Sequence, residues 1–279
     1  MANILAVLTS VFYGISDFTG GFLTKRASEF AVTGVGAAVA ATSFLFIGLG
    51  TQSIFFDRID VKAGLISGAF LFIGNVLYLR ALSQGRMGVI GGTATLLVLI
   101  PLVWDIKNGQ MPSTMSIIGI FITIGGVILL GAPEMKGGSG LGPVFLAAIA
   151  AVFFGLSQIS IDVGSDENIF GTMLVTELVT VVVVLVLAFV KRTTGGLAKN
   201  MIPLLIVVGV TDALALWCFS VATTTGDIAI VSTLAALDPI VLAILALFFL
   251  KEKMTRIQVV AIVIVIAGSA VMSLGGAGG

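Results

Sequence analysis

Four carboxylic acids stand inside long apolar stretches of this sequence: Asp17, Glu177, Asp212 and Asp238. If these stretches cross a membrane, each charge costs roughly 2.5–3.5 kcal/mol near the bilayer centre, so such residues face an internal cavity. The acids can exchange protons, or they can bind a cationic substrate directly. Both hold in an exchanger that releases a proton when a cation enters. The comparably placed base is Arg80, nearer a helix end, and pairing of one acid with Arg80 is the structural alternative.

The position of Asp238 next to Pro239 is a special case among the acids. Proline deprives a helix of one backbone hydrogen bond and frees a carbonyl one turn earlier. A carboxylate beside a free carbonyl is a coordination point for a proton or a cation. The alternative is a simple kink, with Asp238 hydrogen-bonded to a neighbouring hydroxyl.

Uncharged side chains complete the predicted site. Tyr13 and Trp217 lie near the middle of apolar stretches, although these aromatics usually prefer the membrane interface, and their faces can hold an ammonium group. Buried polar groups need partners, and packing or interhelical contact is the alternative role for each. The predicted substrate-binding residues are Tyr13, Asp17, Asn75, Tyr78, Gln158, Glu177, Asp212, Trp217 and Asp238, and the four acids are also the predicted proton-coupling groups. We interpret the phenylalanines as packing residues.

Composition places the chain in a membrane. Of its 279 residues, 58% are hydrophobic and 10% are charged, against roughly 45–50% and about 25% in soluble domains. The sequence has no histidine and a single cysteine, Cys218, which argues against Ser-His or Cys-His catalysis, a metal site or a cofactor. The net charge is zero without a basic run, so we expect no nucleic-acid partner.

Apolar runs long enough to cross a hydrocarbon core of roughly 30 Å recur along the whole chain. We predict ten transmembrane helices at residues 3–24, 30–51, 62–84, 87–106, 114–132, 141–162, 168–190, 201–223, 227–250 and 256–274. The first is interpreted as a spanning helix and not as a removable signal peptide. Residues 1–135 and 136–279 each hold five runs, and the Gly- and Pro-rich stretch 131–140 is interpreted as a flexible linker.

The basic residues predict the orientation in the membrane. Ten lie in the odd-numbered connections: Lys25, Arg26, Arg86, Lys136, Lys191, Arg192, Lys199, Lys251, Lys253 and Arg256. The even-numbered connections carry only Arg58, Lys62 and Lys107. By the positive-inside rule the odd connections are cytoplasmic, so both termini face outward from a multi-pass protein of the inner (plasma) membrane.

The two halves of the sequence are similar. The segment 11–17 (VFYGISD) recurs as 152–158 (VFFGLSQ), and the same separation along the chain, which we call the repeat offset, matches Tyr78 with Phe219. Farther along, the register is predicted to slip so that positions 99–101 match 237–239. Because each copy holds an odd number of spans, the second copy is predicted to enter the membrane inverted, as in many secondary transporters.

Several of these segments resemble a known family. Residues 75–82 (NVLYLRAL), Pro101 and 125–128 in the first half, and residues 238–239 (DP), 250–255 (LKEKMT), Gln258 and 267–268 in the second, are similar to EamA-type members of the drug/metabolite transporter superfamily. The resemblance implies ten helices in two inverted halves, alternating access, and movement of small metabolites. The first copy departs from the pattern at residues 107–111, where the family has an acidic residue, so we assign no role to that loop.

The sequence therefore predicts a secondary transporter that is proton-coupled, with export favoured by the resemblance and a small organic cation or amine-bearing metabolite as its substrate. A neutral amino-acid or sugar carrier, whose acids are structural or only handle protons, is the alternative. A passive channel is a third possibility, and a membrane-embedded enzyme is disfavoured. The predicted partners are the lipid bilayer and the small-molecule substrate, and we expect a monomer because one chain already supplies both halves.

Overall fold

The computed structural model describes residues 1–279 except 52–55, 110–112, 138–139, 166–167, 227, 253 and 277–279, and the described residues form helices and no strands. In chain order the helices are α1 (Ala2–Leu23), α2 (Glu29–Gly50), α3 (Arg58–Gln84), α4 (Met87–Ala94), α5 (Leu99–Lys107), α6 (Thr114–Gly137), α7 (Gly142–Ser165), α8 (Ile169–Lys191), α9 (Ile202–Thr223), α10 (Ile228–Ala235), α11 (Asp238–Leu245) and α12 (Arg256–Gly276). A 3₁₀ turn at Thr95–Val98 joins α4 to α5, and a π turn at Ala246–Leu250 extends α11.

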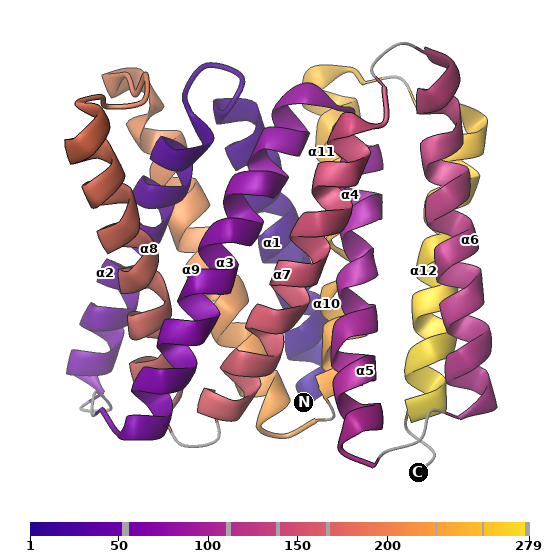
Figure 1. The fold of residues 1–279 in the computed structure, drawn as a ribbon, viewed down its shortest axis with the longest axis horizontal. Helices are drawn as coiled ribbons and strands as arrows, with labels where there is room; N and C mark the ends of the chain where they lie inside the picture. Colours follow the sequence, from indigo (N-terminus) through magenta and orange to yellow (C-terminus); the bar gives the residue numbers. More distant parts are fainter. Residues whose placement is uncertain are drawn as a thin grey trace.

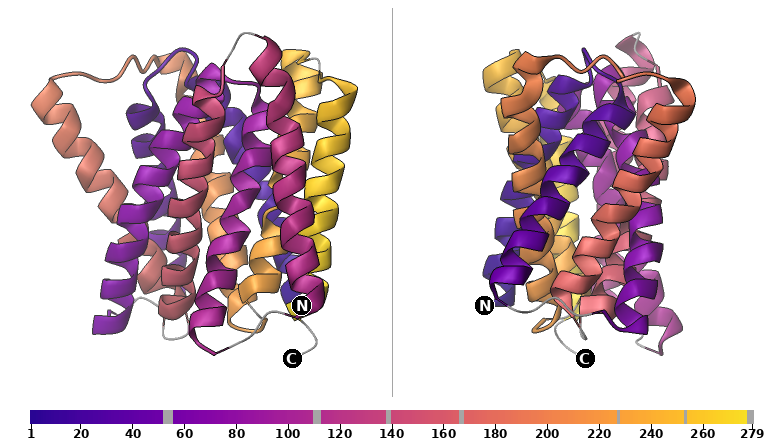
Figure 2. Two further views of the ribbon diagram at one scale, coloured as in Figure 1. Left: turned by 45° about the vertical axis from the view of Figure 1, so that its right-hand side comes forward. Right: turned by 90° about the vertical axis from the view of Figure 1, so that its left-hand side faces the viewer.

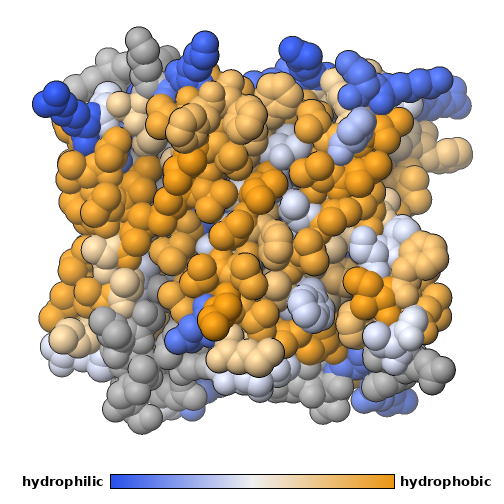
Figure 3. Space-filling view, turned by 180° about the vertical axis from the view of Figure 1, so that it is seen from behind, coloured by the Kyte–Doolittle hydropathy of each residue, from blue (hydrophilic) through white to orange (hydrophobic). Residues whose placement is uncertain are grey.

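The helices have the length and composition of membrane spans. Seven segments in the described residues are long and apolar enough to cross a bilayer, the segment Met87–Trp104 among them, and shorter apolar helices lie at Ile117–Gly126, Asp238–Leu250 and Arg256–Val271. Figure 3 shows the matching surface, with apolar residues across the middle of the molecule and hydrophilic residues along its upper and lower edges. The predicted polytopic membrane protein is confirmed at this level.

The connections separate onto two ends of the helix bundle. In Figure 1 the connections after α1, α3 and α8 lie at the upper end, whereas both termini lie at the lower end. The upper end therefore carries the basic residues of the odd-numbered connections, of which Lys253 lies outside the described residues. This separation is the one that a charge-biased membrane protein requires.

Neighbouring helices come mostly from opposite halves of the chain. α3 packs along α7, α1 along α9, and α6 along α12, while α2 contacts both α8 and α9 (Figures 1 and 2). Small residues permit the closest approaches, as is usual between helices in lipid. A methyl group on Gly14 would lie 2.9 Å from the carbonyl oxygen of Asp238, and one on Gly155 would lie 2.8 Å from that of Leu97.

These glycine contacts correct the register of the repeat. Gly14 and Gly155 are separated by the repeat offset, and so are their contacts Leu97 and Asp238. The predicted slip, which matched Ile100 with Asp238, is therefore wrong at this position. Its basis was the proline in each segment, whereas helix packing depends on where backbones touch.

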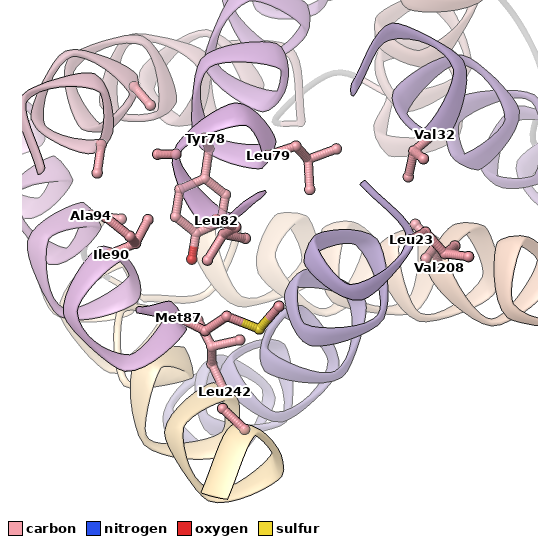
Figure 4. Packing of buried hydrophobic residues seen from close by; sticks show 14 of the residues in the cluster. Leu23, Val32, Tyr78, Leu79, Leu82, Met87, Ile90, Ala94, Val208 and Leu242 are labelled. Carbon is pink, nitrogen blue, oxygen red and sulfur yellow. The ribbon is translucent and has the colours of Figure 1, made fainter. Parts of the chain in front are cut away.

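The largest buried apolar cluster lies toward the upper end, where α1, α3, α4 and α11 meet. Leu82, Met87 and Leu242 belong to it, and Figure 4 shows them close together. Met87 and Leu82 also pack onto Gly21 of α1. A flexible thioether suits this irregular junction of four helices.

Two prolines have different effects on their helices. The ninth apolar run is broken at residues 236–237, and α11 begins anew with Asp238 and Pro239. By contrast, α6 runs through Pro133 to Gly137, so the linker predicted at 131–140 does not begin before residue 138. A proline inside a helix removes one hydrogen bond and often kinks it, and here the helical pattern continues beyond it.

Candidate functional site

A central cavity lies between the two halves of the chain, and most of the predicted site residues line it. They are Tyr13, Asp17, Asn75, Tyr78, Gln158, Asp212 and Asp238. The centre of a water molecule can occupy about 60 Å³ of this cavity. That is room for a few waters at most, since holding even one needs at least roughly 10–15 Å³. In this conformation the cavity is narrow.

A smaller side cavity lies beside the first, toward α2. Asp17, Asn75 and Asp212 line both cavities, and Glu177 lines the side cavity together with Thr33 of α2. By the same measure its volume is about 30 Å³. All four predicted proton-coupling acids therefore border these two adjacent cavities, although they come from four different helices.

Local sequence explains how these side chains reach one place. Tyr13 and Asp17 are four residues apart on α1, and Asn75 and Tyr78 are three apart on α3, spacings that put each pair on one helix face. Gly14 then lets the backbone of α11 approach α1 closely, which brings Asp238 to the face that carries Asp17.

The Asp17 carboxyl group is the best connected of the four acids. The Tyr78 hydroxyl donates a hydrogen bond to Asp17 Oδ2 at 3.1 Å. The Asp238 carboxyl lines the same narrow cavity as that of Asp17. Two carboxyl groups that share a small buried cavity do not both ionise readily, because like charges repel in a low dielectric. The pair therefore favours holding a proton.

Glu177 is buried among helices, with 2% of its surface exposed. Its Oε1 atom receives no hydrogen bond from any described residue, and the neighbouring charged group is Asp212, which has the same sign. A buried carboxylate without partners is unstable, so this group needs a proton, a cation or water beside it.

Arg80 does not neutralise any of these acids. Its guanidinium lies 3.6 Å from Glu29, at the start of α2, and 57% of its side chain is exposed. The alternative in which Arg80 pairs with a core acid is therefore wrong, because Arg80 lies in the last turns of α3 on a surface-facing side. Within the described part of the chain, no Lys or Arg lines either cavity.

The structure corrects the predicted roles of two aromatic residues, Trp217 and Phe154. Trp217 lines neither cavity and is 37% exposed on the surface of α9. Phe154, interpreted as a packing residue, lines the central cavity and meets the Tyr78 ring edge-on, with centroids 5.6 Å apart. A signal for Phe154 was present in the sequence, because the repeat offset matches it with Tyr13.

Comparison with known proteins agrees with this architecture. The profile of the EamA-like transporter family matches residues 141–274. This part of the chain belongs to the EamA-like transporter family. The resemblance seen in the sequence is thereby confirmed over this part of the chain, and the match supports a multi-pass membrane transporter of the drug/metabolite transporter superfamily.

A solved crystal structure that is 16% identical to this EamA-like protein superposes with a TM-score of 0.76, covering 98% of this chain and 96% of the other. At that identity the likeness concerns the fold alone. A comparison with curated proteins gives no match.

Proposed function

We propose that this EamA-like protein is a proton-coupled secondary transporter that exports a small organic cation or an amine-bearing metabolite by alternating access. The observation that carries the proposal is the convergence of Asp17, Glu177, Asp212 and Asp238 on two adjacent cavities that no described Lys or Arg lines. An acidic site in a low-dielectric interior favours positively charged occupants, and protons compete with them.

Ten spans in two inverted five-helix repeats, residues 1–135 and 136–279, form the proposed framework. The lining of the central cavity supports it, because many of its residues form pairs separated by the repeat offset: Tyr13 with Phe154, Asp17 with Gln158, Leu71 with Asp212, Ala94 with Ala235, and Leu97 with Asp238. When a twofold axis relates two repeats, equivalent residues of the two repeats lie close together near that axis. The substrate site of inverted-repeat transporters lies at such an interface.

The proposed mechanism uses a proton carried by Asp17 or Asp238, which line the same cavity. A cation that enters takes the place of this proton, and the aromatic rings of Tyr13 and Phe154, which also line the cavity, suit an ammonium group. The amides of Asn75 and Gln158 supply neutral polar contacts. Because the cavity now admits only water-sized groups, we expect the two halves to move apart on one side before substrate enters.

The proposed setting is the inner (plasma) membrane, with both termini outward. The separation of the basic connections from the termini supports this orientation through the positive-inside rule. A monomer is sufficient for the proposed mechanism, because one chain supplies both halves of the cavity.

Transport in proteoliposomes under an imposed pH gradient tests the proposal. Cationic, zwitterionic, neutral and anionic metabolites are compared for wild type, Asp212→Asn and Asp57→Asn. Asp57 is the matched control, since it lies outside both cavities and Asn caps a helix as well as Asp. We expect cations alone to evoke proton-linked currents, lost in Asp212→Asn and retained in Asp57→Asn. Signals from neutral metabolites that persist in Asp212→Asn would overturn the proposal.

A neutral amino-acid or sugar carrier is the second candidate. The hydrogen bond from Tyr78 to Asp17 favours this neutral carrier, since the Asp17 carboxyl already has a hydrogen-bond partner within the protein. Under this alternative the four acid-to-amide variants keep their substrate affinity, which binding measurements on each purified variant determine. A passive channel differs from both candidates in showing flux that does not saturate with substrate concentration.

A further inference from the structure

A groove much larger than the central cavity runs between α2 and α8 on the outside of the helix bundle. The centre of a water molecule can occupy about 570 Å³ of it. Figure 2, left, shows the cause: the upper part of α8 leans away from the remaining helices. A methyl group on Gly34 of α2 would overlap Val184 of α8, so the two helices touch at that point of the groove.

The lining of this groove has two distinct parts. Lining residues from 31–38 of α2 and 181–188 of α8 are all apolar, whereas Ser28, Lys191, Thr193 and Thr194 lie at one end. From Val181 to Lys191 a helix rises about 15 Å, which is half of a hydrocarbon core of roughly 30 Å. The groove is thus apolar over the depth of one leaflet and polar where headgroups begin. This pattern matches a phospholipid, whose acyl chain spans one leaflet and ends in a polar headgroup.

The charge at the polar end is positive. Lys191 lies over the ring of Phe30, with Nζ 4.9 Å from the centroid, and Arg192 follows it at the end of α8. The Glu29 carboxylate in the same lining is paired with Arg80. Ser28 caps α2, whose N-terminus carries the positive end of the helix dipole. An anionic phosphodiester fits these surroundings better than a zwitterionic headgroup.

We propose that the groove binds one anionic phospholipid of the leaflet at this end, with an acyl chain between α2 and α8 and the phosphate beside Lys191. α2 belongs to the first half of the chain and α8 to the second. The lipid therefore bridges both halves and occupies the groove only while α8 leans outward. Anionic lipid then favours this conformation, independently of which substrate the central cavity takes.

Native mass spectrometry of the purified full-length transporter tests the proposal, with phosphatidylglycerol and phosphatidylcholine of identical acyl chains titrated separately. We expect phosphatidylglycerol to bind more tightly. Lys191→Gln is expected to weaken it about fivefold, the effect of one basic residue near an anionic headgroup, and Ala188→Phe to reduce both lipids by filling the groove. Two controls lie outside the groove: Lys199→Gln at the same end, and Val186→Phe on the lipid-facing surface of α8.

Two results would overturn the proposal. One is equal binding of phosphatidylglycerol and phosphatidylcholine by wild type, which would mean that the groove binds acyl chains without preference for an anionic headgroup. The other is displacement of phosphatidylglycerol by glycerol phosphate, which would make it a phosphate site without a role for the chain. Lys191 is exposed, so Lys191→Gln remains informative if Ala188→Phe fails to fold. Because binding and not transport is measured, the outcome does not depend on the proposed transport function.

Discussion

The two halves of the molecule line the central cavity at positions that the repeat offset matches, but with different chemistry. Where the second half has Asp238, the first has Leu97, and where the first has Asp17, the second has Gln158. The cavity already holds Asp17, Asp212 and Asp238, so an acid at Gln158 or Leu97 would add another like charge in a low dielectric. Like charges so placed cannot all ionise. Matched positions can therefore share their place in the fold without sharing an acid.

Unlike the acids, the glycines at helix contacts occur at matched positions in both halves of the chain. Gly85 packs against Ile90 and Pro143, and its counterpart Gly226 packs against Val231 and Ala2. Every partner in the second set is matched by the repeat offset to one in the first. Helix packing needs a small residue at the matched position of each half, whereas proton and cation binding needs an acid in only one of the two halves.

The largest expected effect on transport comes from removing the acid at position 17, and a second variant then places an acid at the matched position 158 instead. Asp17→Asn removes a hydrogen-bonded acid, and we expect proton-driven transport to fall about 10- to 100-fold, the cost of losing a charged hydrogen bond. The double variant Asp17→Gln with Gln158→Asp is expected to recover part of this loss, because both positions line one cavity. Initial rates in proteoliposomes measure it. An exchanged variant no better than Asp17→Asn would show that the two positions are not equivalent.

The packing glycines should respond equally in both halves. A methyl group added at Gly14 or at Gly155 would lie 2.5 Å from the β-carbon of a facing side chain. We expect Gly14→Ala and Gly155→Ala each to lower stability by about 1–3 kcal/mol, as overpacking does. Thermal unfolding in detergent measures this. Gly125→Ala is the control, since nothing lies within 4 Å of its added methyl group. Unequal losses at Gly14 and Gly155 would argue against equivalent helix contacts.

The aromatic residues distinguish a cavity wall from an outer surface. Phe154→Leu removes a ring that lines the cavity, and we expect the substrate KM to rise about fivefold, corresponding to a cation–π contribution near 1 kcal/mol. Trp217→Leu should leave the KM unchanged because Trp217 lines neither cavity. Saturation curves for the two variants decide the point. A larger effect from Trp217→Leu would place the substrate elsewhere.

The smallest expected effect concerns Glu252, in the connection after α11, which ties the second half to the first. Its Oε2 accepts a hydrogen bond from the Met87 amide at 3.1 Å. Burial raises the pKa of Glu252 above its usual value, although Lys25 and Arg86 partly oppose this. Folding thus favours the protonated form of Glu252. The contribution of this group to the stability of the folded protein is complete below its pKa in the unfolded chain, and it is lost as the pH rises through its pKa in the folded protein.

Melting temperatures of wild type and Glu252→Gln across that pH range test the connection between the halves. We expect the wild type to lose stability relative to the variant as the pH rises. Glutamine keeps an acceptor oxygen for the Met87 amide, so the hydrogen bond itself is retained. Parallel pH profiles for the two proteins would mean that this carboxyl does not titrate differently on folding.

Several properties follow from the sequence alone, because they depend on residues that are near one another along the chain. The length of each apolar run predicts helix bounds such as Glu29–Gly50 closely, and the basic connections predict which ends lie together. The spacing of Tyr13 and Asp17 predicts a shared helix face. The motifs after Asp238 indicate the EamA-like family, which the profile match over residues 141–274 confirms.

Other properties are decided only by the tertiary structure. Membrane helices are apolar all round, so the hydrophobic pattern that marks the inner face of a soluble helix is missing here. For this reason the sequence could not reveal that Trp217 faces outward, that Phe154 faces the cavity, or that Arg80 pairs with Glu29. Which side of a helix faces a cavity depends on where its neighbours' backbones touch, and contacts such as Gly14 with Asp238 fix that in three dimensions.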